Sequence, residues 1–376
     1  MLKAELYRIF SRKTALAGML IPILFVIFLY GGISVWEEGV VDEGRVYQGG
    51  EAITRDQEIA EEFAGTLTEE TVREIWNRYG PSMIYQNRDT SRENLEALAK
   101  IGKNDNFCNR FVTRLFCREE RGEQGEITYV LQEDLSENRM LQGEYIFGYT
   151  GEGWNWYWDK FSVAFVLVCI VIIVSLSPTF SEDYVCHTAD VLLPAAKGRM
   201  GLWLTRILAG TIYSSLYYWL IMGILLIQRL IFYGAGGLAV SSGLTGSLVV
   251  WGEEAIPLWK TLTLMHFCGW LSVIFLTWMV LGLSARARQT FSTLMWSLLL
   301  YLGPFAAVRI ILDQLPMVFV NRLVHYIVYS MPLTYAGMVL QSPLSGRRFL
   351  TGMALAAALL AAGWGARGWC RHQVDR

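Results

Sequence analysis

Long runs without a charged side chain constrain this chain more than any other feature. Residues 15–35 and 161–179 contain no Asp, Glu, Lys or Arg. Each run approaches the ~20 residues that an α-helix needs to cross a hydrocarbon core of ~30 Å. Charged residues make up 18% of the chain, against about 25% in a typical soluble protein. The sequence therefore predicts an all-α polytopic membrane protein.

Six transmembrane helices are expected, at residues 14–35, 158–179, 202–229, 261–284, 289–312 and 349–366. The first run follows a basic start, as in a signal peptide. It is longer than the usual signal core of ~7–15 residues, however, and no A-x-A-like cleavage site follows it. We therefore expect it to remain as a span, with Pro22 producing a kink near its inner end.

Basic residues beside the spans predict the orientation in the membrane. They cluster before the first span and after the last, so the positive-inside rule places both termini in the cytoplasm, the tail at residues 367–376 included. Residues 313–348 are expected to form outer re-entrant or interfacial helices, broken near Pro332. The alternative is a seventh span at residues 318–340, but a central charge such as Arg322 costs ~2.5–3.5 kcal/mol. Localisation in the plasma membrane is expected.

Two segments outside the spans have helical patterns of their own. Residues 1–13 are predicted to form an amphipathic interfacial helix, with Leu2, Leu6 and Ile9 on one face. Residues 36–157 form a large acidic insert, expected to be a mainly helical extracytoplasmic domain. Its helical runs are at residues 56–78 and 92–117, and short extended pieces are expected at residues 127–131 and 145–149. Residues 230–260 are expected to form a second outer loop.

Cysteines in the insert leave two alternatives open. Cys108 and Cys117 are the two cysteines of residues 36–157. They can form a disulfide if the insert is extracytoplasmic, or remain as two thiols.

The segment at residues 180–201 is unusually structured for a turn between two spans. Acidic residues come first, an apolar stretch ending in Pro194 follows, and basic residues close it. We expect this segment to be a cytoplasmic docking loop, because apolar side chains give contact area and charged ones give specificity. The candidate docking residues are Glu182, Asp183, Thr188, Val191, Leu192, Leu193, Lys197 and Arg199.

Catalytic motifs are absent from the sequence. There is no G-x-x-x-x-G-K-[ST] phosphate loop, no H-E-x-x-H and no G-x-S-x-G, and the four histidines lack metal-ligand spacing. We therefore expect no catalytic, cofactor-binding or metal-binding residues on this chain, no enzyme activity and no nucleic-acid partner.

The layout resembles the permease subunits of type-2 ATP-binding-cassette transporters. Shared features are the basic N-terminal helix, six spans with both ends inside and the structured loop after the second span. The family's loop pattern is matched by Phe180, Asp183, Tyr184, Thr188, Leu192, Leu193 and Arg199. Asp183 stands where the family usually has Glu, and His187 where it usually has Gly, so the local turn is expected to differ.

The resemblance implies an ATP-driven exporter. A separate ATPase subunit would carry ATP and Mg²⁺ and dock on the loop at residues 180–201, and a second permease copy or a paralogue would complete the transporter. The alternative function is a multispan membrane sensor or assembly scaffold with an extracytoplasmic ligand-binding domain. An intramembrane enzyme is the third class, which the missing motifs disfavour.

Overall fold

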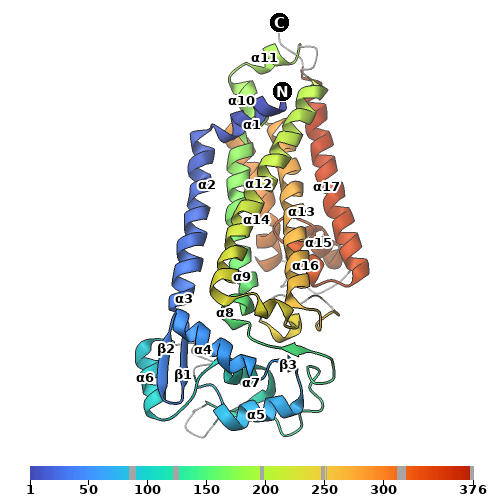
Figure 1. Ribbon diagram of the computed structural model, residues 1–376. Coiled ribbons are helices and arrows are strands. Elements are labelled where there is room, and N and C mark those ends of the chain that lie inside the picture. Colours follow the sequence, from blue (N-terminus) through green and yellow to red (C-terminus); the bar gives the residue numbers. More distant parts are fainter. Residues whose placement is uncertain are drawn as a thin grey trace. The chain divides into compact units, whose positions relative to one another are not determined.

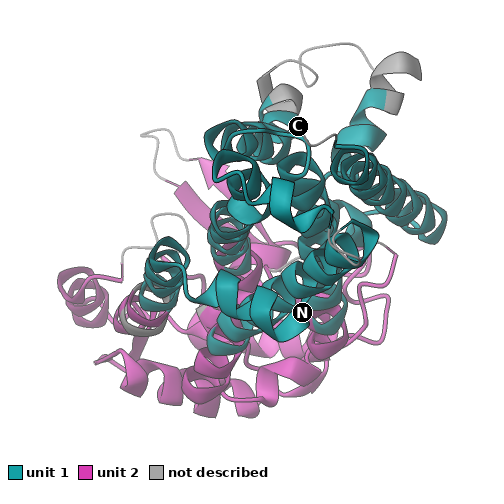
Figure 2. Ribbon diagram, turned by 90° about the horizontal axis from the view of Figure 1, so that it is seen from above, with its two compact units in different colours: residues 1–26, 161–224, 263–376 teal, residues 27–160, 225–262 magenta. Residues whose placement is uncertain are grey.

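The computed structural model describes residues 1–83, 90–121, 127–194, 199–246, 250, 252–310 and 319–372. The chain is mostly helical, as predicted (Figure 1). It divides into two compact units (Figure 2). Unit 1 comprises residues 1–26, 161–224 and 263–376, and unit 2 comprises residues 27–160 and 225–262.

The long helices make this a membrane-embedded protein. Four helices are long and apolar enough to cross a membrane: Tyr157–Val185, Met200–Tyr233, Leu258–Ser284 and Leu344–Cys370. The count rises to five if the pair Leu2–Phe10 and Lys13–Phe28, bent by 66°, is one span. Thr290–Ala306 is a shorter apolar helix. The arrangement of six spans remains a prediction.

Helices alone make up the described part of unit 1. They are α1 (Leu2–Phe10), α2 (Lys13–Phe25), α9 (Tyr157–Leu176), α10 (Pro178–Val185), α11 (Ala189–Leu192), α12 (Met200–Tyr233), α13 (Leu258–Ser284), α14 (Thr290–Ile310), α15 (Phe319–Tyr329), α16 (Tyr335–Leu340) and α17 (Leu344–Cys370). The ends of α9, α12 and α13 extend into unit 2. The two short helices α15 and α16 are separated by a break that contains Pro332, as predicted; their depth in a membrane remains a prediction.

The first apolar run changes helix type after its proline. Pro22 lies inside α2, and the chain passes at Val26 into a π-helix, η1 (Val26–Ile33). A last helical turn, α3 (Ser34–Trp36), follows. Proline has no N–H to donate to the carbonyl one turn earlier in an α-helix. The missing hydrogen bond at Pro22 explains the change to π-helix that follows it.

Hydrogen bonds and small residues hold the helices of unit 1 together. The Thr277 hydroxyl donates to Ser214 Oγ at 2.8 Å, and Tyr213 OH donates to Ser175 Oγ at 2.9 Å. Helices α13 and α17 approach most closely at two glycines, because a Cβ on Gly365 would lie 2.6 Å from Gly282 Cα. Small residues at a helix crossing allow the two backbones to approach this closely. Inside lipid the hydrophobic effect does not drive helices together, so close packing of this kind stabilises their association.

The Gly365→Leu substitution is expected to separate α13 from α17 and lower the melting temperature of the detergent-solubilised protein. Gly363→Leu is the control, because a Cβ at that position meets nothing within 4 Å. Thermal unfolding of both variants, followed by tryptophan fluorescence, tests this. Equal melting temperatures for the two variants would contradict the close crossing.

Unit 2 combines helices with three small antiparallel sheets. Its first helices are α4 (Gly50–Glu61), α5 (Glu69–Tyr79), α6 (Arg92–Lys100), α7 (Phe107–Phe116) and α8 (Gly151–Asn155). Its sheets pair β1 (Gly39–Asp42) with β2 (Arg45–Gln48), β3 (Gly65–Thr66) with β6 (Ile146–Phe147), and β4 (Cys117–Arg121) with β5 (Ile127–Leu131). The predicted extended pieces at residues 127–131 and 145–149 correspond to β5 and β6.

Local sequence signals explain several of these elements. Glu43 and Gly44 connect β1 to β2 with φ of 49° and 77°, the conformation of a two-residue type I′ hairpin turn. The Thr68 hydroxyl accepts from Thr71 N–H and caps α5. Asn106 caps α7 in a reciprocal pair with Asn109.

The second segment of unit 2 is bonded to the first. After α12 the chain forms two 3₁₀ turns, η2 (Gly236–Ala239) and η3 (Ser242–Leu244). Ser241 N–H donates to Ile146 O at 3.0 Å, and Ile146 N–H donates to Ser241 Oγ at 2.8 Å. Arg114 donates to Leu244 O at 2.6 Å. The expected outer loop at residues 230–260 is therefore partly built into the same unit as the insert.

Of the two alternatives for Cys108 and Cys117 that the sequence leaves open, the structure has the two separate thiols. Both cysteines are free thiols. Cys108 lies in the first turn of α7 and Cys117 directly follows its last residue. Nine residues along a helix span about 13 Å, whereas bridged Cα atoms lie within about 7 Å. Burial raises the pKa of the Cys117 thiol to about 12 and that of the Cys108 thiol well above its usual value.

Alkylation is expected to follow this placement. Denatured protein should label at all six cysteines without reductant, and adding reductant should leave the mass unchanged. In the folded protein at pH 8, the exposed Cys186 should react before Cys108 and Cys117, which are mostly protonated and so carry little of the reactive thiolate. Intact-mass spectrometry measures both results. An alkylation mass gain that appears only after reduction would show that two cysteines form a disulfide.

Candidate functional site

The segment at residues 180–201 begins as helix rather than loop. Helix α9 is followed after one residue by α10, and the two count as one apolar stretch, Tyr157–Val185. A turn at His187, with φ of 57°, leads to α11. This left-handed conformation favours glycine, the residue usual at this position in the family that the sequence resembles. The His187 side chain is exposed to solvent.

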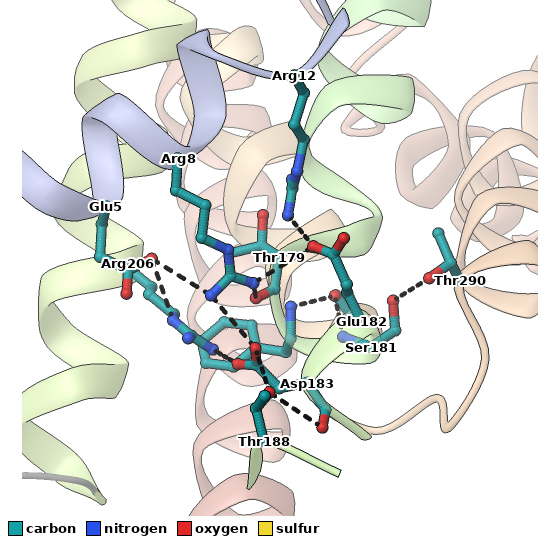
Figure 3. Close-up of polar contacts among 12 residues, drawn as sticks. Glu5, Arg8, Arg12, Thr179, Ser181, Glu182, Asp183, Thr188, Arg206 and Thr290 are labelled. Carbon is teal, nitrogen blue, oxygen red and sulfur yellow. Dashed lines mark hydrogen bonds and ion pairs between the residues drawn. The ribbon is translucent and has the colours of Figure 1, made fainter. Parts of the chain in front are cut away.

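Six charged side chains meet where α1, α10 and α12 come together (Figure 3). We call this the charge cluster; it contains Glu5, Arg8, Arg12, Glu182, Asp183 and Arg206. Arg8 Nη1 lies 3.3 Å from Asp183 Oδ1, and Arg206 Nε lies 3.3 Å from Glu5 Oε2. Closer ion pairs join Arg206 to Asp183 and Arg12 to Glu182. The three positive and three negative charges balance.

Arg206 is the most deeply placed member of the charge cluster. Its side chain is 1% exposed, and its guanidinium carbon lies 4.9 Å from the Phe180 ring centroid and 5.3 Å from that of Trp369. Aromatic faces and carboxylates together compensate a guanidinium that has left water. Trp369, at the end of α17, also packs on Tyr184.

The N-terminal helix is held by its charges as well as by its apolar face. Arg8 donates to Thr179 O at 2.7 Å, and Arg12 donates to Ser175 O at 3.2 Å. Ile9 is buried, and the Phe10 ring packs edge-on against Tyr213. Burial lowers the pKa of Arg12, and the neighbouring Glu182 carboxylate counteracts the shift. Arg8 and Arg12 therefore lie against the protein.

The other side of α10 is fixed to the end of α13. Ser284 Oγ accepts from Phe180 N–H at 3.0 Å and donates to Ser177 O at 2.7 Å. Tyr184 OH donates to Ala285 O at 2.9 Å. Helix α10 is thus connected to α1, α12, α13 and α17, all within unit 1.

The predicted docking residues separate into internal and exposed groups. Asp183 and Leu193 are buried, and Glu182 joins the charge cluster. The Thr188 hydroxyl donates to Asp183 at 3.1 Å, and Leu192 is half-buried. Val191 projects outward and Arg199 bonds to Cys370 O. Lys197 lies outside the described residues.

Asp183 is therefore engaged within the fold, whereas the side chain of Glu182 is 46% exposed, and the docking role of both residues stays a prediction. Sequence reasoning also missed Glu5, Ser284 and Trp369. Two signals were present in the sequence: Glu5 is the only acid in a basic N-terminal helix, and Arg206 interrupts an apolar run. Each charge predicts an opposite charge nearby in the fold.

No family model, curated protein or solved structure matches this chain. Among the described residues, no group of three or more His, Cys, Asp or Glu side chains is arranged to hold a metal ion.

The Arg206→Met substitution is expected to destabilise unit 1 by about 3–5 kcal/mol, because it leaves the carboxylates of the charge cluster in excess. Adding Asp183→Leu restores the charge balance, so the double variant should recover part of the loss. The exposed pair of Arg73 and Glu69 provides a control, since Arg73→Gln should cost less than about 1 kcal/mol. Unfolding in detergent with increasing denaturant measures all three. Additive losses in the double variant would contradict the pairing.

Proposed function

We propose that this chain is the membrane-spanning permease subunit of an ATP-driven exporter in the plasma membrane, with both termini in the cytoplasm. A separate ATPase chain, carrying ATP and Mg²⁺, docks on α10 and α11. A second permease copy or a paralogue completes the transporter. The observation that carries the proposal is that α10 and α11 are both exposed at one end and connected to four other helices through buried contacts.

Transmission of force requires such a connection. A push on the turn between α10 and α11 acts on α1 and α12 through the charge cluster and on α13 through Ser284. Packed elements with buried ionic contacts move as rigid bodies. A flexible loop would absorb the same displacement. Closure of an ATPase against this turn would therefore move the helices of unit 1 together.

Basic residues at the same end of unit 1 support the cytoplasmic orientation. Arg286 at the end of α13 lies over the Trp364 ring at 4.6 Å, and Arg199 bonds to Cys370 O at the end of α17. These residues lie at the end that also carries Trp369 and the charge cluster. An excess of Lys and Arg marks the cytoplasmic side of membrane proteins.

The surface offered to the ATPase is apolar. The side chain of Val191 is 77% exposed and that of Val185 is 56% exposed. His187 and Pro194 are exposed beside them. A few protruding apolar side chains that enter a cleft on a partner carry most of the energy of such an interface. We therefore place the centre of the docking surface at Val185 and Val191.

The Val191→Asp substitution is expected to reduce the amount of co-purified ATPase at least about tenfold, because it places an unpaired charge at the centre of an apolar contact. The fold should survive, since Val191 makes little internal contact. The measurement is a pull-down of the tagged chain from its native membrane in mild detergent, with mass spectrometry of bound proteins. Ile101→Asp, at an equally exposed apolar residue of unit 2, should leave the yield unchanged.

Two outcomes would overturn the proposal. One is a wild-type pull-down without any phosphate-loop protein, under conditions that preserve a known transporter complex; this result would favour the sensor or scaffold function. The other is unchanged ATPase recovery with Val191→Asp, which would move the docking surface elsewhere.

A further inference from the structure

Unit 2 contains a cavity that the coupling role does not use. Its volume is about 490 Å³, within the range of small-molecule sites. Seventeen residues line it, and all of them belong to unit 2. Helix α7 supplies one face with Phe107, Arg110, Phe111 and Arg114, which follow the i, i+3, i+4, i+7 spacing of a single helical stripe.

The cavity lies at the ends of two candidate membrane spans. Trp156 and Lys160 line it from the start of α9, and Arg229 and Tyr233 line it from the last turn of α12. Trp and Tyr at the ends of spans mark the level of lipid headgroups. A ligand in this cavity is therefore at the height of the polar part of the bilayer.

Four cationic side chains line one cavity. Three are arginines held in fixed positions. Arg110 donates to Gly39 O at 2.5 Å and pairs with Asp105, Arg114 donates to Leu244 O, and Arg229 lies over the Tyr233 ring at 5.5 Å. The fourth is Lys160. Guanidinium groups with a fixed orientation match the oxygens of a phosphate.

The acidic residues that line the cavity differ in their burial and in their hydrogen bonds. Glu38 accepts from Tyr233 OH at 2.6 Å, and Asp56 accepts from Phe107 N–H at 2.8 Å at the start of α7; both are buried. Glu37 is exposed, and its carboxylate makes no salt bridge within the described residues. Trp156 and Tyr233 line the same cavity, and aromatic rings are a feature of sites that bind ammonium groups.

We propose that this cavity binds a zwitterionic phosphoamine headgroup, with the phosphate on the side of Arg110, Arg114, Arg229 and Lys160 and the ammonium group at Glu37. The same chemistry is offered by a membrane lipid such as a phosphatidylethanolamine and by a soluble phosphoamine ester. The inference is independent of the proposed coupling role, because every lining residue belongs to unit 2.

The test uses the full-length protein purified in detergent and calorimetric titration with four probes. They are short-chain phosphatidylethanolamine, short-chain phosphatidylglycerol, free phosphoethanolamine and free glycerol phosphate. Saturable binding of the amine-bearing member of each pair, about tenfold tighter than its glycerol counterpart, is expected, since a charge-assisted contact of this kind changes affinity by about that factor. Binding of the lipid alone identifies the bilayer as the source. Equal binding of free phosphoethanolamine identifies a soluble source.

Two variants separate the two halves of the headgroup. Lys160→Gln should weaken binding of both lipids about tenfold, and Lys160→Arg should restore it. Glu37→Gln should abolish the preference for the amine and leave phosphatidylglycerol affinity unchanged. Lys103→Gln and Glu51→Gln, at exposed residues that do not line the cavity, should behave like the wild type in every titration.

Three results would overturn the proposal. They are the absence of saturable binding by the wild type, equal affinity for the amine and glycerol probes, and full affinity in Lys160→Gln protein. A melting temperature equal to that of the wild type shows that a variant is folded. Because these titrations contain no ATPase, their failure leaves the coupling proposal standing, and a failed pull-down leaves the headgroup site standing.

Discussion

Burial of the Arg206 guanidinium imposes a requirement on three other parts of unit 1. A cation removed from water needs opposite charge close by, and it receives this from Asp183 of α10 and Glu5 of α1. Arg8 then compensates the carboxylates, and the Trp369 ring covers the remaining face. One buried charge on α12 thus accounts for the positions of the N-terminal helix, of α10 and of the end of α17.

The sequence predicted the elements better than their contacts. Long uncharged runs and the Thr68 cap act through neighbouring residues, so the helices and most of their ends were predictable. The shared position of Glu5 and Arg206 was not, because residues two hundred positions apart are brought together only by the packing of several helices. The same reason applies to the contacts of Asp183. An acid in a polar stretch is expected on the surface, and only the fold shows that Arg8 and Arg206 surround it.

The cavity of unit 2 illustrates a second limit of sequence reasoning. In the sequence, Arg110 and Arg114 resemble ordinary surface charges on an amphipathic helix. Their partners are far away along the chain: Arg110 binds Gly39 O and Arg114 binds Leu244 O. Lys160 and Arg229 look like charges that merely end apolar runs. The cavity exists because the insert packs against the end of α12, and a charge pattern along the chain does not show which distant segments pack together.

The construction of unit 2 from two separated segments also determines when it can be completed during synthesis. Its first part ends at residue 160, but strand β6 obtains its partner Ser241 only after residues 161–224 have been made. At typical rates of about 5–20 residues per second, translation of the roughly 100 intervening residues takes about 5–20 s. During that interval Ile146 of β6 lacks its hydrogen bonds with Ser241, and the side chain of Arg114 lacks the Leu244 carbonyl that it later binds. Completion of the insert therefore depends on synthesis of the helices that follow it, and a defect in those helices would leave an unfinished, aggregation-prone domain.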